Sequence, residues 1–206
     1  MVAPLLLLIT AAVQAAPRWH HDGVLRRLGD NRTQLPGTAN CTEYFFRQEL
    51  DHFDFQNNVT FLQRYFVHDG YWKPGGPIFF YAGNEADVTL YVNHTGLMWE
   101  SAEQFGALLL FAEHRYWGQS CPFSLGATCG DDMKPENPNA QQKQFLTYEQ
   151  VLLDFVRLLA AFQRERVMNA PVIAFGGSCE SFFHTRQPHT LSRIPHERAW
   201  DRPFLT

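Results

Sequence analysis

Long apolar runs, basic clusters and metal-ligand spacings are all missing from this sequence, and each absence excludes a class of protein. After the first sixteen residues, no stretch approaches the ~20 apolar residues that a membrane-spanning helix needs. The formal net charge is -4 and Lys and Arg form no run, which argues against a nucleic-acid partner. The four cysteines lack Cys-x-x-Cys or Cys/His spacing, so the sequence predicts no metal site, and no other cofactor is predicted.

The composition that is present is that of a globular domain. The chain has 206 residues, of which 45% are hydrophobic and 15% are aromatic. A chain of this length can bury a core of its own, and its composition is neither that of a disordered nor that of a fibrous protein. We see no internal repeats.

The first residues are typical of a secretion signal. An apolar run over 5–13, broken only by Thr10, is followed by small residues that fit a cleavage site, although no Lys or Arg precedes the run. The alternative is a buried N-terminal helix. The run is too short to span a bilayer, which favours the signal peptide. We therefore predict a signal peptide over 1–16, entry into the secretory pathway, and a lysosomal or extracellular destination.

Sequons and cysteines agree with export. Four acceptor patterns for N-glycosylation begin at Asn31, Asn40, Asn58 and Asn93. Disulfides are permitted in an exported protein. Cys121 and Cys129 are close in sequence and bracket a loop with Pro and Gly, so we favour this pair. Cys41 then has no evident partner. The four sequons predict that the segments that contain them lie on the surface of a glycoprotein.

Hydrophobic patterning predicts an α/β fold. Two aromatic-rich stretches, 44–46 and 60–67, suit an antiparallel hairpin. Short continuous apolar runs predict buried strands over 77–82, 107–112 and 171–175. Helices are expected over 96–105 and 148–167, and a long loop over 118–140. The alternation of strand and helix predicts a mostly parallel sheet with flanking helices and right-handed crossovers.

The helix expected over 148–167 carries the strongest pattern. Thr147 suits the N-cap and Gln150 stands three residues later, as in a capping box. Its apolar residues recur at intervals of four, three and four, and form a stripe of the width that core-facing helices show: Val151, Phe155, Leu158 and Phe162. We interpret this stripe as core and not as a ligand site.

The ends of two predicted strands carry candidate chemistry. The third apolar strand runs into Gly176-Gly177-Ser178, which resembles half of the Gly-x-Ser-x-Gly nucleophile elbow. An elbow needs glycines because strand and helix pass closely there. Gly83-Asn84-Glu85 follows the first apolar strand, where this architecture supplies a backbone N–H to an oxyanion. An ordinary strand-end turn is the alternative for that loop.

Several motifs in order resemble one family. Asp51-His52-Phe53, Gly83-Asn84-Glu85, the segment 111–116 and Gly176-Gly177-Ser178 are similar to signature segments of the lysosomal prolyl peptidases. That family comprises dipeptidyl peptidase II, also called dipeptidyl peptidase 7, and lysosomal Pro-X carboxypeptidase. The resemblance runs from about residue 43 to Ser178. It implies an α/β-hydrolase fold, a Ser-Asp-His triad, and peptide substrates with proline near the cleaved bond.

The resemblance also implies roles for individual residues. Ser178 matches the nucleophile, and Gly83 and Asn84 match the loop beside the oxyanion hole. By the same resemblance, Glu85 helps to bind the charged end of the substrate. His114, inside Glu-His-Arg-Tyr at a strand end, is expected to be hydrogen-bonded scaffold.

The sequence departs from the family after Ser178. The family continues with Tyr-Gly-Gly, whereas this chain continues with Cys179 and Glu180. No apolar period is visible over 179–206, so we predict a divergent, disordered tail there, with 17–178 as the N-terminal part of an incomplete α/β-hydrolase domain. The triad order Ser, Asp, His is not met after Ser178, because every later histidine precedes Asp201. Losing triad members costs on the order of 10⁴- to 10⁶-fold in rate.

These observations predict a serine-type exopeptidase of the proline-specific family, present here as a truncated and inactive form. The alternative is a non-catalytic secreted glycoprotein that binds peptides or the full-length enzyme. A lipase or esterase of the same fold is the strongest enzyme rival, and only the family resemblance favours peptides. Cys179 as a thiol nucleophile is disfavoured, since no upstream His/Asn pair is placed for it.

Overall fold

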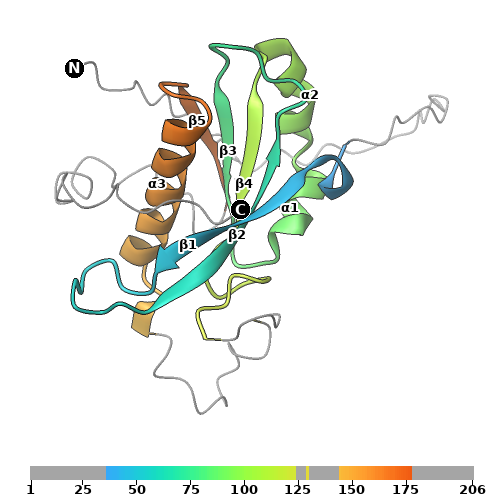
Figure 1. Cartoon of the computed structure of the whole chain (residues 1–206). Helices are drawn as coiled ribbons and strands as arrows, with labels where there is room; N and C mark the ends of the chain where they lie inside the picture. Colours follow the sequence, from blue (N-terminus) through green and yellow to red (C-terminus); the bar gives the residue numbers. More distant parts are fainter. Residues whose placement is uncertain (1–35, 124–128, 130–143, 178–206) are drawn as a thin grey trace, which may run out of the picture.

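A computed structural model describes residues 36–123, 129 and 144–177 of the chain. The predicted signal peptide, Asn31, Ser178 and the predicted tail over 179–206 lie outside the described residues. The described elements are a short 3-10 helix, five strands and three α-helices (Figure 1): η1 (Thr38–Asn40), β1 (Thr42–Glu49), β2 (Thr60–His68), β3 (Ile78–Ala82), α1 (Val88–His94), α2 (Gly96–Phe105), β4 (Leu108–Ala112), α3 (Tyr148–Glu165) and β5 (Val172–Phe175).

The described strands form one mixed sheet in the order β1-β2-β4-β3-β5. β1 pairs antiparallel with β2, and β2 pairs antiparallel with β4. β3 pairs parallel with both β4 and β5. The predicted α/β class and the predicted hairpin are therefore confirmed, and the parallel part of the sheet is the triplet β4-β3-β5.

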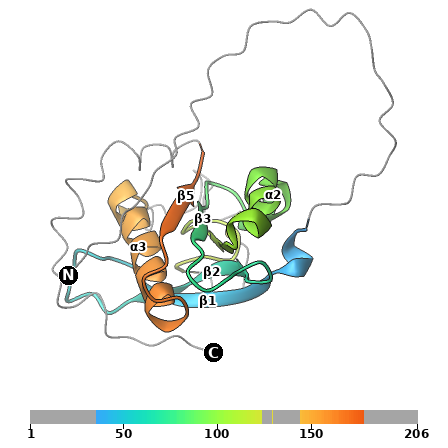
Figure 2. The ribbon, with the colours of Figure 1, turned by 90° about the horizontal axis from the view of Figure 1, so that it is seen from above.

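Helices cover both faces of this sheet (Figure 2). α3 packs on one face through Val151, Phe155, Leu158 and Phe162, which confirms that the predicted stripe is core. α1 and α2 pack on the other face, where Val88, Val92 and Trp99 are buried against the sheet. Because both faces are covered, every residue of β3 and β4 is buried, and this is why these strands are continuous apolar runs.

Two local structures differ from the predicted pattern. Helix α1 was not expected from its β-branched residues; its first turn is stabilised by Asp87, whose side chain accepts a hydrogen bond from the Thr89 N–H. At α3, Thr147 caps the helix by accepting from the Gln150 N–H. The Gln150 side chain does not complete the capping box, because it bonds instead to Asp51 and to the His52 N–H.

The order of the strands places a topological switch point at β3. From β3 the chain passes over one face, through α1 and α2, to β4 on one side. It then returns over the other face, through α3, to β5 on the opposite side of β3. In open α/β sheets, ligands bind outside the carboxyl ends of the strands at such a point. The fold therefore directs attention to the residues that follow β3 and β5.

Shortening a core side chain of α3 tests the packing. Leu158 is fully buried under the sheet, whereas Leu152 on the same helix is only half-buried. We expect Leu158→Ala to lower the free energy of unfolding by about 2–5 kcal/mol, since the substitution leaves a cavity. Leu152→Ala makes the same change in helix propensity, and we expect it to lower the free energy of unfolding by clearly less. Equal losses in urea unfolding would contradict the described orientation of α3.

Candidate functional site

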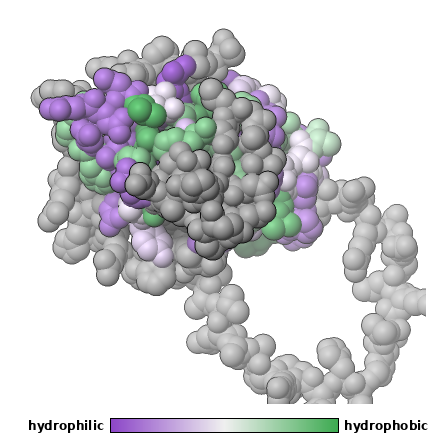
Figure 3. All heavy atoms as spheres, turned by 90° about the horizontal axis from the view of Figure 1, so that it is seen from below, coloured by the Kyte–Doolittle hydropathy of each residue, from purple (hydrophilic) through white to green (hydrophobic). Residues whose placement is uncertain are grey.

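Three segments meet at the carboxyl edge of the parallel strands. Gly83-Asn84-Glu85 follows β3, Glu113-His114-Arg115 follows β4, and Gly176-Gly177 follows β5. Figure 3 views the molecule from the end where these strands finish, and its described surface mixes hydrophobic and hydrophilic residues. The edge therefore gathers residues that lie more than ninety positions apart in the sequence, Asn84 and Gly177 among them.

A direct hydrogen bond joins the two segments that carry the predicted chemistry. The Asn84 Nδ2 donates to the Gly177 carbonyl oxygen over 2.7 Å. Asn84 is buried, and its Oδ1 lies 3.4 Å from the Tyr81 hydroxyl, which donates to it. The structure thus places the predicted oxyanion loop against the residue that directly precedes Ser178. Ser178 itself is outside the described residues, so its role stays a prediction.

Gly83 is required by a close backbone approach. Its N–H donates to the Ala112 carbonyl over 2.9 Å, and a Cβ at this position would lie 2.3 Å from the same oxygen. Because this N–H is already used to bind β4, it is not free to stabilise an oxyanion. Any N–H that the loop offers to an oxyanion must come from Asn84 or Glu85. Glu85 is exposed, in keeping with a loop that faces solvent or substrate.

The loop is held from behind by the carboxylate of Glu113. This side chain is fully buried and accepts hydrogen bonds from the backbone N–H groups of Val88, Gln119 and Ser120. It also pairs with Arg64, which in turn bonds to Asp87 over 2.7 Å. Since Asp87 ends the loop that begins at Gly83 and Val88 begins α1, this cluster fixes the far end of the loop.

The charges of this cluster are matched. Burial alone would raise the pKa of Asp87, but its hydrogen bonds with Thr89 and Arg64 outweigh burial and lower that pKa.

Gly118 adopts a positive φ of 54°, and a Cβ there would meet the Glu113 carboxylate and Arg64. The tight turn after β4 therefore also depends on glycine.

His114 is part of this scaffold. Its Nδ1 lies 2.6 Å from the Arg115 carbonyl, which can only accept, so Nδ1 carries the proton. Burial lowers the pKa of His114 and favours its neutral form. The ring packs edge-on against Trp117, with 4.7 Å between centroids. These contacts support the structural role expected for this histidine.

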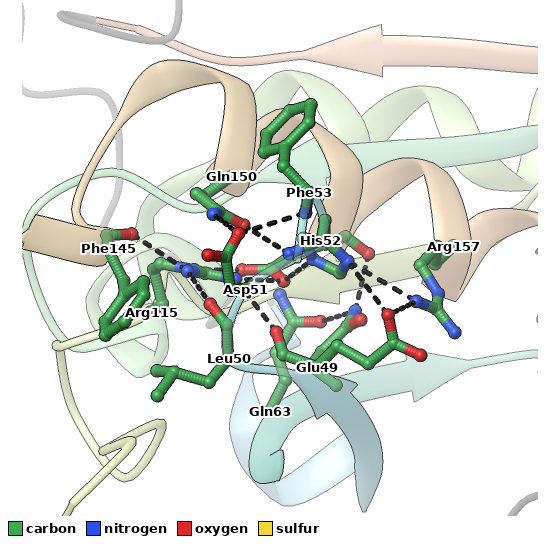
Figure 4. A network of polar contacts seen from close by, with 12 residues as sticks. Glu49, Leu50, Asp51, His52, Phe53, Gln63, Arg115, Phe145, Gln150 and Arg157 are labelled. Atoms are coloured by element: carbon green, nitrogen blue, oxygen red, sulfur yellow. Dashed lines mark hydrogen bonds and ion pairs between the residues drawn. The ribbon is translucent and has the colours of Figure 1, made fainter. Parts of the chain in front are cut away.

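A second buried network joins the β1–β2 loop, the end of β4 and α3 (Figure 4). The guanidinium of Arg115 binds both carboxylate oxygens of Asp154, with contacts of 2.6 and 2.7 Å. Its remaining N–H groups reach backbone carbonyls, including that of Leu50 at 2.9 Å. His52 Nε2 lies 2.7 Å from Asp154. The signature residue His52 therefore joins the loop to α3.

Charged side chains lie on both sides of the His52 ring. Its Nε2 faces Asp154, and its Nδ1 lies 3.4 Å from Arg157 Nη1 and 4.0 Å from Glu49 Oε2. Burial alone would raise the pKa of Asp154, but the charge and hydrogen bonds of Arg115 lower it, with a smaller contribution from His52. The sequence singled out the segments that contain His52 and Arg115 as family motifs, but it predicted no contact between them. The signal that was missed is Asp154, a charged residue inside the apolar stripe of α3.

The sequon asparagines Asn40, Asn58 and Asn93 are exposed. Cys121 and Cys129 form a disulfide with Cα atoms 5.4 Å apart. Among the described cysteines, Cys41 is unpaired, and burial raises its pKa to about 12.

In the described part of the chain, no group of three or more His, Cys, Asp or Glu side chains could hold a metal ion. In the same residues, no helix is both long and apolar enough to cross a bilayer.

A switch-point site of this kind, with a strand ending in Gly-Gly beside a Gly-Asn-Glu loop, defines part of an α/β-hydrolase fold. Comparison with known proteins identifies the family. Residues 48–189 match the family described as Serine carboxypeptidase S28, and the chain belongs to that family of serine peptidases. The matched range includes Ser178 and extends past the boundary predicted there, to residue 189.

The names of similar proteins agree with this family. The chain is 43% identical over 180 residues to lysosomal Pro-X carboxypeptidase of Homo sapiens, covering 81% of this chain and 34% of the relative. It is 39% identical over 198 residues to the protein of the same name in Mus musculus, covering 90% and 37%. It is 31% identical over 175 residues to thymus-specific serine protease of Homo sapiens, covering 75% and 31%. The chain thus spans about a third of the length of these relatives.

Neutralising Asp154 tests the buried network. A carboxylate whose pKa is lowered by folding adds stability above its unfolded pKa of ~3.9, and this stability is lost as pH falls toward the folded value. We expect Asp154→Asn to lower the free energy of unfolding by about 3–5 kcal/mol at pH 7, because Arg115 is left buried without its partner. The difference in free energy of unfolding between wild type and variant should become smaller below about pH 4.

Glu149→Gln is the matched control, since it makes the same chemical change at an exposed position of α3. Its effect should stay within about 1 kcal/mol. Urea unfolding across pH measures both variants. If Asp154→Asn lowers the free energy of unfolding only slightly at pH 7, or lowers it more in acid than at pH 7, the described pairing is contradicted.

Proposed function

We propose that this chain carries the nucleophile segment and oxyanion loop of a serine-type exopeptidase that cleaves peptides with proline near the scissile bond. The observation that carries this proposal is the hydrogen bond between Asn84 and Gly177, which holds the loop after β3 against the residue before Ser178. The preference for proline is supported by the names of relatives that are called Pro-X carboxypeptidases.

The proposed chemistry assigns a role to each segment. Ser178 Oγ attacks the carbonyl carbon of the scissile bond, and the carbonyl oxygen acquires negative charge. The N–H groups of Asn84 or Glu85 donate to that oxygen, since the Gly83 N–H is already bonded. Glu85, exposed at the same edge, binds a charged end of the peptide. A general base must remove the proton of Ser178.

We further propose that a polypeptide made of residues 1–206 alone is inactive. None of its residues after Ser178 supplies an Asp followed by a His, and Glu180 stands where the elbow pattern has glycine. The base and its orienting carboxylate would then be missing. We also propose that 1–16 is a signal peptide, that 17–178 forms the peptidase part, and that the product enters the secretory pathway toward the lysosome or the exterior.

Labelling with a fluorophosphonate tests these assignments, because the probe reacts only with an activated serine. Antibodies against residues 36–123 would capture the protein from cells that make it. We expect the captured material to carry the probe on the serine after Gly176-Gly177 and to hydrolyse proline-containing peptides. The recombinant polypeptide 1–206 should give no more adduct than its Ser178→Ala variant.

The outcomes separate the rival functions. Adduct on the wild-type 1–206 polypeptide would contradict its inactivity. Captured material that cleaves acyl esters but no peptides would favour a lipase or esterase. Captured material without any adduct would favour a non-catalytic glycoprotein, a reading that the replacement of the elbow glycine by Glu180 already motivates.

A further inference from the structure

The loop between β1 and β2 exposes an unusual amount of apolar surface. Phe53, Phe55 and Val59 are 56%, 66% and 48% exposed in a stretch of seven residues. The loop extends away from the sheet at the lower left of Figure 1. Exposed apolar side chains that gather on one part of a surface mark a site that another group covers.

The backbone of this loop is ordered by its own hydrogen bonds. The Asn57 N–H donates to the Asp54 carbonyl over 3.1 Å and closes a turn. The Val59 N–H donates to Asn57 Oδ1 over 3.0 Å, and the Leu50 N–H donates to the Val59 carbonyl over 2.9 Å. The exposure of Phe55 therefore belongs to a defined turn.

Asn58 lies within this apolar stretch and begins a sequon with Thr60. It differs from the other two described sequon asparagines. Asn40 Oδ1 accepts from the Gly37 N–H, and Asn93 Oδ1 accepts from the Thr38 N–H. In the described part of the chain, the Asn58 side chain makes no such bond. Asn58 is three residues from Phe55, so their Cα atoms are at most about 11 Å apart.

We propose that an N-linked glycan on Asn58 packs its first sugar ring against Phe55 and covers the apolar turn. The C–H face of a pyranose ring is apolar and suits the face of an aromatic ring, and the contact removes part of Phe55 from water. This inference rests on the secretory route proposed above.

Attachment of the glycan is a glycosyl transfer from a lipid-linked oligosaccharide diphosphate. The anomeric carbon of the first sugar bonds to Asn58 Nδ2, its bond to the diphosphate breaks, and lipid diphosphate and the amide proton are released. The packing against Phe55 follows this step and needs no further reagent.

A double-mutant cycle tests the contact in the 1–206 chain made by eukaryotic secreting cells. The four forms are wild type, Asn58→Gln, Phe55→Ala and the double variant. Removing the glycan should lower the Tm by about 2–4 °C when Phe55 is present and by less than about 1 °C when it is replaced. Thr42→Ala, which removes the exposed Asn40 sequon, is the matched control. It should lower the Tm by the same amount whether Phe55 is present or replaced by Ala.

A second readout needs no melting transition. Chymotrypsin cleaves after Phe55, and the glycan should slow this cleavage several-fold relative to Asn58→Gln. Equal loss of Tm in both backgrounds together with unchanged cleavage would overturn the proposal. Mass spectrometry shows which asparagines carry a glycan. If Asn40 and Asn93 carry one and Asn58 does not, the proposal is overturned while the secretory route stands. If all three were unmodified, the proposal would fall together with the secretory route.

Discussion

The parallel pairing of β3 with both of its neighbours is the constraint on which the rest of this structure depends. Because β4, β3 and β5 run parallel, their carboxyl ends finish at one edge of the sheet. The two crossovers pass over opposite faces, which makes this edge a topological switch point. The Asn84 amide then bonds to the Gly177 carbonyl across that edge. The fold thereby brings a loop and a strand end together that no local pattern could have joined.

Two buried carboxylates hold this edge in place. Glu113 collects backbone N–H groups from α1 and from the turn after β4, while Asp154 joins α3 to Arg115 and to the β1–β2 loop. Buried ion pairs are weak evidence for stability, since desolvation offsets much of their attraction. Their value here is geometric, because each carboxylate has directional partners on several elements and so fixes how those elements meet.

The sequence predicted what local patterning controls. Continuous apolar runs gave β3, β4 and β5, and the 3.6-residue stripe with Thr147 gave α3. Strand ends also indicated the two site segments. Helix α1 was not predicted because its β-branched residues obscure a helical pattern that Asp87 caps locally. The buried networks were not predicted because Asp87, Glu113 and Asp154 bind arginines distant in sequence. The nucleophile Ser178 stays a prediction, supported by the family to which the chain belongs.

Cross-linking across the edge tests the central claim most directly. With Cys41 and Cys179 replaced by serine, Asn84→Cys and Gly177→Cys would be introduced together and treated with a short thiol cross-linker. The account predicts efficient cross-linking in the native chain, loss of it in urea, and none for an Asn84→Cys/Met168→Cys pair, because Met168 lies before the start of β5, at the opposite end of the parallel strands. Equal yields for the two pairs in the native chain would contradict the convergence of β3 and β5 at one edge.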